Sequence, residues 1–361
     1  MADGAFDGIV QREGALAPLL HDRRSRLVDA RWLEAAQDWS AAVWTTAAAV
    51  GPADLSTTEI ERGLTIAQRP VFLCGTHRSG TTLLRDLLDG HPRLVVLPSE
   101  GSFYTHMQPR LAGLSDREQA SEMGREWLRR LVNPNNQPPF WLLGRSGPHG
   151  SPYVNFARAL AVWWPMLRDR SPDGPDPWPL AAVALAFGTA CHASGIPPEA
   201  TMWAEKTPTN ERFLEQLWRE YPSAKVIQII REPGAVLTSH KAFSPGSWRA
   251  GRDTAAVFRN LARSYRVALE HSRRTGPDRY CLIRYEDLVE QREAVTQRLA
   301  AFLGIEALPA LSRPTVAGIA ATRNSSFAGI GPGCGVLSRV DRLCLALAVG
   351  NAPGRLGYGS S

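Results

Sequence analysis

The segment VFLCGTHRSGTTLLRDLL, which begins at Val71, constrains the fold of this chain more than any other. Its short apolar run ends at Gly75, Gly80 follows after four residues, and a helical pattern continues from there. Glycines let the main chain approach a ligand closely, and the N–H groups at the start of a helix bind anions. The segment therefore predicts a strand, an anion-binding loop and a helix, which together form one unit of a parallel sheet.

The loop differs from a nucleoside-triphosphate loop at one position. That loop has the pattern G-x-x-x-x-G-K-[ST], in which the lysine serves the β- and γ-phosphates and the next hydroxyl serves magnesium. Thr81 occupies the lysine position here. Arg78 is then the cation of the loop, and Ser79, Thr81 and Thr82 supply hydroxyl groups, so we expect an anion other than a magnesium-bound triphosphate. A plain strand–turn–helix junction is the alternative, but it does not explain this combination of residues.

Four further segments predict strands of the same sheet that end in polar residues. The clearest is AKVIQII, whose apolar, β-branched residues are typical of a strand buried on both faces. Ligands bind at the carboxyl ends of parallel strands, so side chains there are candidates for a site. The candidates are Glu100 in the segment 94–100, Lys206 in 201–210, Arg231 after 224–230, and the polar end of 279–288.

Each candidate has a functional and a structural interpretation. Arg231 fits a bidentate ligand of a second phosphate, with Ser239 adding a hydroxyl, or else half of a surface Arg–Glu pair. Lys206 fits an active-site cation or a solvated lysine. Glu100 fits a general base or a capping glutamate. Three histidines compete with it for the role of base: His77, His106 and His240.

The pattern along the chain predicts three regions. They are an N-terminal helical lead-in over 1–66, an α/β domain over 67–310, and a loop-rich C-terminal segment over 311–361. The lead-in has helical spacing over 15–50 and a Ser or Thr cap near residue 56. Within the α/β domain, the aromatic-rich stretch 101–200 predicts a helical insertion beside the sheet. Thr207 is expected to cap a helix that has Pro208 at its first position.

The composition excludes several classes of protein. The net charge is +6, but there is no run of five basic residues, so a nucleic-acid partner is not expected. Of 41 basic residues 38 are arginines, which fits either a GC-rich genome or an anionic ligand. The five scattered cysteines fit neither a disulfide framework nor a zinc site and favour a reducing cytoplasm. We expect no signal peptide and no membrane span.

Four motifs together resemble the sulfotransferases that use 3′-phosphoadenosine-5′-phosphosulfate (PAPS), and most of all a bacterial branch similar to tyrosylprotein sulfotransferases. The motifs are PVFLCGTHRSGTTLL, WAEKTP, AKVIQIIREPGAVLTS and RYEDLV. They cover roughly residues 68–106 and 201–305. The resemblance implies a three-layer α/β fold of the P-loop type with a central parallel sheet, N-terminal helices, and a helical insertion on the acceptor side.

The resemblance also implies a role for each candidate residue. The 5′-phosphosulfate would be bound by Arg78, Ser79, Gly80, Thr81 and Thr82. Arg231 and Ser239 would bind the 3′-phosphate, and Tyr285 would lie near the adenine. Glu100 corresponds to the catalytic base, and Lys206, together with Arg78, to the cations that stabilise the transferring group. The C-terminal segment RNSSFAGIGPG has hydroxyl residues but no lysine to help bind the phosphosulfate.

The expected activity is in-line sulfuryl transfer from PAPS to a hydroxyl, without a metal. The acceptor is expected to be a small molecule, phenolic or from secondary metabolism, and a tyrosine in a peptide is the alternative. A metal-dependent P-loop kinase and a non-catalytic nucleotide-binding protein are the rivals from other classes. The expected partners are PAPS and the acceptor, with neither membrane nor nucleic acid, and the oligomeric state is open, a homodimer being one option.

Overall fold

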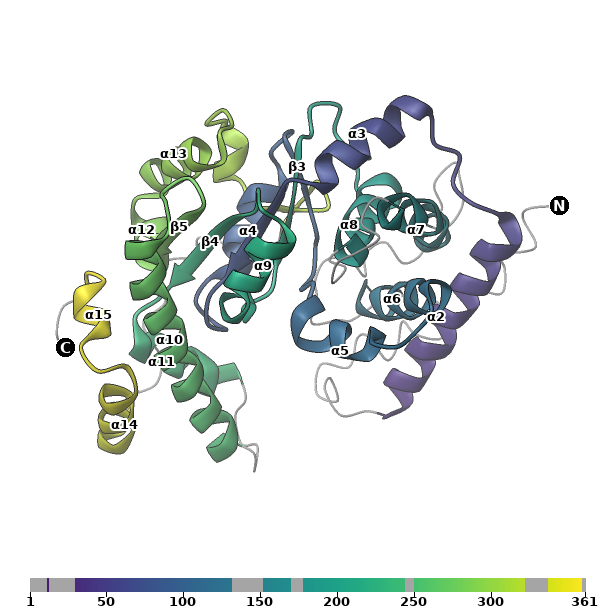
Figure 1. Ribbon diagram of the computed structural model, residues 1–361. Helices are drawn as coiled ribbons and strands as arrows, with labels where there is room; N and C mark the ends of the chain where they lie inside the picture. Colours follow the sequence, from purple (N-terminus) through teal and green to yellow (C-terminus); the bar gives the residue numbers. More distant parts are fainter. Residues whose placement is uncertain are drawn as a thin grey trace.

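The computed structural model of the chain places a sheet beside a group of helices (Figure 1). It describes residues 30–131, 152–169, 178–243, 250–321 and 337–358, and Arg12. The predicted helix over 15–29 and the segment RNSSFAGIGPG at 323–333 lie outside these residues. Among the described residues, no helix combines the length and the apolar character needed to cross a membrane.

The central sheet has five parallel strands in the order β2-β3-β1-β4-β5. The strands are β1 Pro70–Cys74, β2 Leu94–Val96, β3 Met202–Lys206, β4 Lys225–Ile230 and β5 Tyr280–Arg284. Leu73 of the middle strand lies in register with Lys206 on one side and Ile227 on the other. The predicted parallel α/β sheet is confirmed, and its carboxyl edge brings the ends of β1, β3 and β4 together.

Alternating side chains of each strand supply two cores, one on each face of the sheet. Val71 and Leu73 point into one core, whereas Phe72 and Cys74 point into the other. The first face is covered by α4 Thr81–Asp89, α12 Tyr285–Glu290 and α13 Arg292–Leu303. The opposite face is covered by α3 Thr57–Ala67, α8 Trp178–Ala190, α9 Leu214–Glu220 and α11 Ala250–Arg274. Helices on both faces of the sheet make the three layers.

The described part of the predicted insertion is helical. It comprises the π-helix η1 Phe103–Met107, α5 Gln108–Leu111, α6 Asp116–Leu131, α7 Pro152–Arg168 and α8. The N-terminal helix α2 Ala30–Val50 packs across α6 and α7 (Figure 1). Trp39, Trp127, Tyr153 and Trp163 are completely buried in this part. These aromatic side chains therefore extend the core on the Phe72 face of the sheet and do not line an open pocket.

Three local predictions are wrong. The strand β2 ends at Val96, so Glu100 lies in an irregular segment four residues beyond the strand. Thr207 caps no helix, because the short 3₁₀ helix Asn210–Arg212 and α9 begin further along the chain. Tyr285 starts helix α12 and is not part of a strand. For the segment at Glu100 and for Thr207, tertiary hydrogen bonds replace the regular local pattern.

The predicted cap near residue 56 is confirmed, and the segment predicted to be rich in loops contains regular elements in its described part. Ser56 caps α3 in a capping box with Glu59. Gly304 ends α13 in the left-handed conformation, with φ 72°. The described residues beyond 311 contain the two-stranded sheet of β6 Thr315–Val316 and β7 Ile319–Ala320, followed by α14 Arg339–Val349 and α15 Ala352–Arg355. Helices α14 and α15 pack on α11, and α10 Pro233–Phe243 packs on α11 and α14.

Candidate active site

The loop between β1 and α4 adopts a conformation that requires its glycines. Gly75 and Gly80 have φ values of 139° and 94°. A Cβ atom at Gly75 would collide with the carbonyl oxygen of Ile229, and one at Gly80 would collide with the ring of Tyr285. Arg78 also lies in the left-handed region, with φ 71°, which is uncommon for a residue with a side chain. The loop is thus held in a shape that only this pattern of glycines permits.

Main-chain N–H groups of this loop are available to an anion. Ser79 N donates to Thr76 O at 3.0 Å, which closes the turn. Helix α4 begins at Thr81, and the first N–H groups of a helix have no partner within the helix. The hydroxyl of Thr76 is buried and has no hydrogen-bond partner among the described residues. The predicted binding residues Ser79 to Thr82 therefore surround the positive end of α4.

Arg78, Arg231, Ser239 and Tyr285 form a connected group at the next strand end. Arg78 Nε donates to Ser239 Oγ at 3.2 Å, and Arg231 NH1 donates to the carbonyl oxygen of Arg78 at 3.1 Å. The Arg231 guanidinium lies 4.3 Å from the ring centroid of Tyr285, and its Nε is buried without a partner in the described part of the chain. Four residues predicted from three distant segments are thus brought together.

The two arginines of this group favour an anionic ligand. Burial and the neighbouring charge of Arg231 lower the pKa of Arg78. Two like charges this close repel each other, and a phosphate between them would offset that repulsion. The available Arg231 Nε, the Thr76 hydroxyl and the glycine-shaped loop therefore fit an anionic ligand.

Glu100, in the irregular segment after β2, forms an ion pair with Lys206, at the end of β3. The distance from Lys206 Nζ to Glu100 Oε1 is 2.8 Å, and the side chains are 5% exposed for the lysine and 35% for the glutamate. Burial acts to raise the pKa of the Glu100 carboxyl, but the charges of Lys206 and His77 outweigh it and lower the pKa to about 2. The carboxylate is therefore ionised and accessible, and the lysine is fixed beside it.

His77, which sequence analysis left without a role beyond that of a competing base, is a neighbour of this pair. Desolvation lowers the pKa of its ring, the Glu100 carboxylate opposes that change, and the charges of Lys206 and Arg212 add to it. His77 precedes Arg78 in the loop, so the loop links the two groups of residues. The imidazole here can exchange a hydrogen bond with a ligand at the Glu100–Lys206 pair.

Two buried glutamates that the sequence analysis did not single out hold the main chain of the site. Glu211 Oε2 accepts from Gly75 N at 3.0 Å, and Glu205 Oε2 accepts from Gly101 N at 3.1 Å. Burial raises the pKa of both carboxyls to about 7, although the hydrogen bonds that they accept oppose the change. Glu205 and Lys206 are adjacent in β3, so their side chains point to opposite faces of the sheet. This alternation was the one feature of the sequence that could have indicated a buried Glu205.

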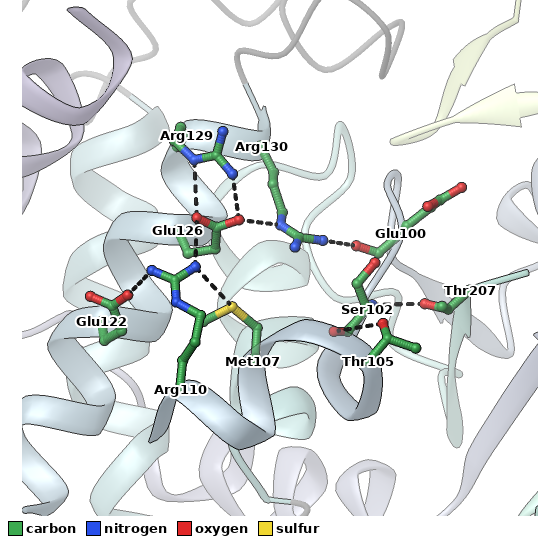
Figure 2. Close-up of polar contacts among 10 residues, drawn as sticks. All are labelled: Glu100, Ser102, Thr105, Met107, Arg110, Glu122, Glu126, Arg129, Arg130 and Thr207. Atoms are coloured by element: carbon green, nitrogen blue, oxygen red, sulfur yellow. Dashed lines mark hydrogen bonds and ion pairs between the residues drawn. The ribbon is translucent and has the colours of Figure 1, made fainter. Parts of the chain in front are cut away.

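The hydroxyl of Thr207 also serves the main chain. Its Oγ1 accepts from Ser102 N at 2.7 Å and donates to Glu205 Oε2 at 2.9 Å, and Figure 2 shows the first of these contacts beside Glu100. The threonine predicted to cap a helix therefore orders the segment that follows Glu100. Within the described ranges, no group of three or more His, Cys, Asp or Glu side chains is arranged to hold a metal ion.

The fold is a three-layer α/β fold whose loop after β1 lacks the lysine of nucleoside triphosphatases and lies beside a carboxylate–lysine pair. The family model described as the sulfotransferase family matches residues 70–309. This match spans more than half of the chain, so the chain belongs to the sulfotransferase family. No curated protein shows significant similarity to it.

Solved structures of bacterial sulfotransferases are similar to this chain at low identity. The sulfotransferase domain of the Synechococcus olefin synthase is 20% identical, with 81% of this chain and 96% of that domain covered and a TM-score of 0.45. The sulfotransferase STF1 from Mycobacterium tuberculosis is 16% identical, with 96% and 93% covered and a TM-score of 0.44. The corresponding values for STF9 from Mycobacterium avium are 16%, 86%, 85% and 0.42.

Proposed function

We propose that this protein transfers the sulfuryl group of PAPS to a hydroxyl group of a small acceptor, with Glu100 as the base. The observation that supports this most is the Glu100–Lys206 pair, at 2.8 Å, beside His77 of the anion-binding loop. A carboxylate next to an anion site is unfavourable unless it has a function, and accepting a proton is the natural one. The sulfotransferase family supplies the reaction class.

The residues that would hold PAPS fall into two sets. Arg78, Ser79, Gly80, Thr81 and Thr82 would bind its 5′-phosphosulfate. Arg231 and Ser239 would bind its 3′-phosphate, with Tyr285 near the adenine. PAPS supplies an activated sulfuryl group whose leaving group is the nucleotide PAP. Backbone N–H groups, Arg78 and Lys206 are the donors that offset negative charge on the transferring and leaving groups, so the proposal needs no metal.

The ion pair explains how the base becomes active. With its pKa held at about 2, the Glu100 carboxylate is a weak proton acceptor while it is paired with Lys206. An anionic ligand beside the pair draws the lysine toward itself, and the carboxylate then loses part of its stabilising partner. Its pKa rises, and it accepts the proton of the acceptor hydroxyl more readily. Lys206 therefore pairs with the Glu100 carboxylate in the free protein and with the anionic ligand during transfer.

We further propose a phenolic or secondary-metabolite acceptor and a bacterial cytoplasmic protein. The support is that the Glu100 side chain is open enough for a hydroxyl to reach it, at 35% exposed, and that cysteine usage favours a reducing compartment. Membership of the branch similar to tyrosylprotein sulfotransferases stays a prediction, and a tyrosine peptide is the acceptor that it would favour.

The test is transfer of ³⁵S from labelled PAPS to a panel of phenols, alcohols, amines, sugars and tyrosine peptides. The proposal expects a labelled phenol or alcohol and the release of PAP without added metal. Label on tyrosine peptides alone would establish the alternative acceptor. Tight PAP binding with no labelled product would contradict the enzymatic proposal and favour a nucleotide-binding protein, and a magnesium-dependent transfer from ATP would favour a kinase.

A further inference from the structure

The peptide unit that joins Glu100 to Gly101 is held from both ends by side chains of distant elements. Arg130 NH1, from helix α6, donates to the carbonyl oxygen of Glu100 at 3.0 Å (Figure 2). Glu205 Oε2, from strand β3, accepts from the N–H of Gly101 at 3.1 Å. One donor and one acceptor on opposite sides fix the plane of this peptide, and with it the direction in which the Glu100 side chain leaves the main chain.

The residues that follow Glu100, Gly101 and Ser102, are also fixed by contacts with distant side chains. Ser102 N donates to Thr207 Oγ1 at 2.7 Å, and Ser102 has a φ of 48°, which reverses the chain. A Cβ atom at Gly101 would collide with the carboxylate of Glu205. The irregular segment after β2 therefore has a defined conformation although it belongs to neither a strand nor a helix.

The orientation of the Arg130 side chain is in turn fixed by the buried carboxylate of Glu126. Its Nε donates to Glu126 Oε1 at 2.8 Å, and the Glu126 side chain is only 7% exposed. Burial acts to raise the pKa of Glu126, but its hydrogen bonds and the charges of Arg129 and Arg130 lower it to about 2. Glu126 is thus ionised in the folded protein and holds the Arg130 guanidinium in one orientation, with NH1 toward Glu100.

Arg129 provides an internal comparison. It binds the same carboxylate with two hydrogen bonds, Nε to Oε2 at 3.0 Å and NH2 to Oε1 at 2.6 Å. Figure 2 shows the dashed lines from Arg129 running to Glu126 alone, whereas Arg130 extends from Glu126 to the Glu100 carbonyl. The two neighbouring arginines therefore share one partner and differ in whether they reach the base.

We infer that Arg130 is a positioning residue for the base, through which the helical insertion orients Glu100 toward Lys206. This inference rests on the proposed role of Glu100. The hydrogen bond from Arg130 to Glu100 is made to the main-chain carbonyl, so Arg130 acts through the position of the base and not on the reacting groups. It connects α6, in the acceptor-side insertion, to the chemistry at the sheet edge.

The test compares the variants Arg130→Ala and Arg129→Ala in the full chain. Misplacing a base by about 1 Å can cost about 10²-fold in rate, so we expect a fall of that order in kcat for Arg130→Ala. The Kd for PAP and the acceptor KM stay unchanged, and Arg129→Ala keeps a kcat near that of the unmodified protein. Equal kcat losses in the two variants would overturn the inference, because both lose an ion pair with Glu126.

A pH profile separates positioning from general destabilisation. The charged groups that face the Glu100 carboxylate are Lys206, His77 and Arg130, and the charge of Arg130 contributes to lowering the pKa of the base. Removing that charge raises this pKa, so the acid limb of kcat/KM moves to higher pH in Arg130→Ala and stays in place in Arg129→Ala. An unshifted limb in Arg130→Ala would contradict the inference.

Hydrogen exchange of the main-chain amides tests, without an activity assay, whether Arg130 orders the segment around Glu100. We expect faster exchange at the Gly101 and Ser102 amides in Arg130→Ala than in Arg129→Ala. Unchanged exchange would overturn the inference. If the unmodified protein transfers no sulfuryl group while this difference in exchange is present, the proposed function fails and the contact from Arg130 to the Glu100 peptide stands.

Discussion

The proposed phosphate-binding half of the site and its proposed acid–base half are built in different ways. The phosphate-binding half consists of the loop Gly75–Thr82 with Arg231, Ser239 and Tyr285, and most of these residues follow directly on a strand. The acid–base half consists of Glu100 and Lys206, and its base lies in an irregular segment beyond β2. Short-range geometry places the first half, and contacts between distant elements place the second.

Each half also depends on one buried carboxylate, and the two carboxylates are six residues apart. Glu211 holds the N–H of Gly75 at the start of the loop, and Glu205 holds the N–H of Gly101 beside the base. The segment that contains both, from the end of β3 to the 3₁₀ helix before α9, is thus the structural link between the halves. Disturbing one half should leave the other working, and the predictions below use that separation.

A large effect on the rate of transfer is expected for Lys206→Ala. Removing a preorganised donor of transition-state charge typically costs about 10²–10³ in rate, so kcat should fall by that factor. The Kd for PAP should stay unchanged, because PAP lacks the sulfuryl group that Lys206 serves. The measurement is single-turnover ³⁵S transfer together with calorimetry of PAP binding.

The control for this variant is Lys225→Ala. Lys225 lies at the opposite end of the sheet, where its Nζ donates to the carbonyl oxygens of Asp278 and Phe302. It should keep its rate of transfer even if it lowers the melting temperature. A Lys206→Ala protein that turns over at the rate of Lys225→Ala would show that Lys206 has no part in transfer.

An intermediate effect is expected on the pH dependence of stability in Glu205→Gln. Burial raises the pKa of this carboxyl from 4.5 to about 7, so the folded state binds the proton more tightly than the unfolded state. The resulting stabilisation is complete below pH 4.5 and is lost as the pH rises through 7, by an amount on the order of 3 kcal/mol. Glutamine does not titrate, so the fall in the free energy of unfolding between pH 5 and pH 8 should shrink by that amount.

Denaturant unfolding at a series of pH values measures this change. Glu211→Gln is the matched variant, because its carboxyl has the same shift and the same kind of main-chain partner. In each single variant, the free energy of unfolding should lose the part of its pH dependence that comes from the substituted carboxyl. A Glu205→Gln protein with the full dependence of the unmodified chain would mean that this carboxyl is ionised in the folded state at neutral pH.

A smaller effect is expected for Arg231→Ala, and it should be confined to nucleotide binding. Hydrogen bonds to charged groups contribute about 1.5–3 kcal/mol each, so affinity for PAP should fall by about 10- to 100-fold. Affinity for adenosine 5′-monophosphate, which lacks the 3′-phosphate, should hardly change. Arg284→Ala is the control, because Arg284 ends the neighbouring strand but its Nε and NH2 donate to Asp287 at 2.9 and 2.5 Å. Equal losses of affinity for the two nucleotides would show that Arg231 does not bind the 3′-phosphate.

The parts of the fold that were predictable from sequence are those governed by local patterns. The strand–loop–helix unit at Val71, the buried strand before Arg231 and the capping box at Ser56 all follow from residues close together in the chain. Parallel strand ends then had to share one edge, so Lys206 and Arg231 could be assigned to the site before their neighbours were known.

The unpredicted parts depend on contacts between distant residues. Arg130 reaches the carbonyl of Glu100 across 30 residues, and Glu205 reaches Gly101 across 104. Thr207 has the sequence of a helix cap, but its hydroxyl bonds to Ser102 instead, because that amide is buried and needs an acceptor. Helix patterns and strand patterns contain no information on such pairs, so the conformation around the base could not be predicted.

The separation of the two halves is tested most directly by measuring both functions on Glu100→Gln. The amide keeps the shape of the side chain but cannot take up a proton, and general-base catalysis typically contributes about 10²–10⁴ in rate. We predict that single-turnover ³⁵S transfer falls by such a factor while calorimetry gives an unchanged Kd for PAP. Transfer at the unmodified rate, or a loss of PAP affinity that matches the loss of transfer, would contradict the assignment of Glu100 as the base.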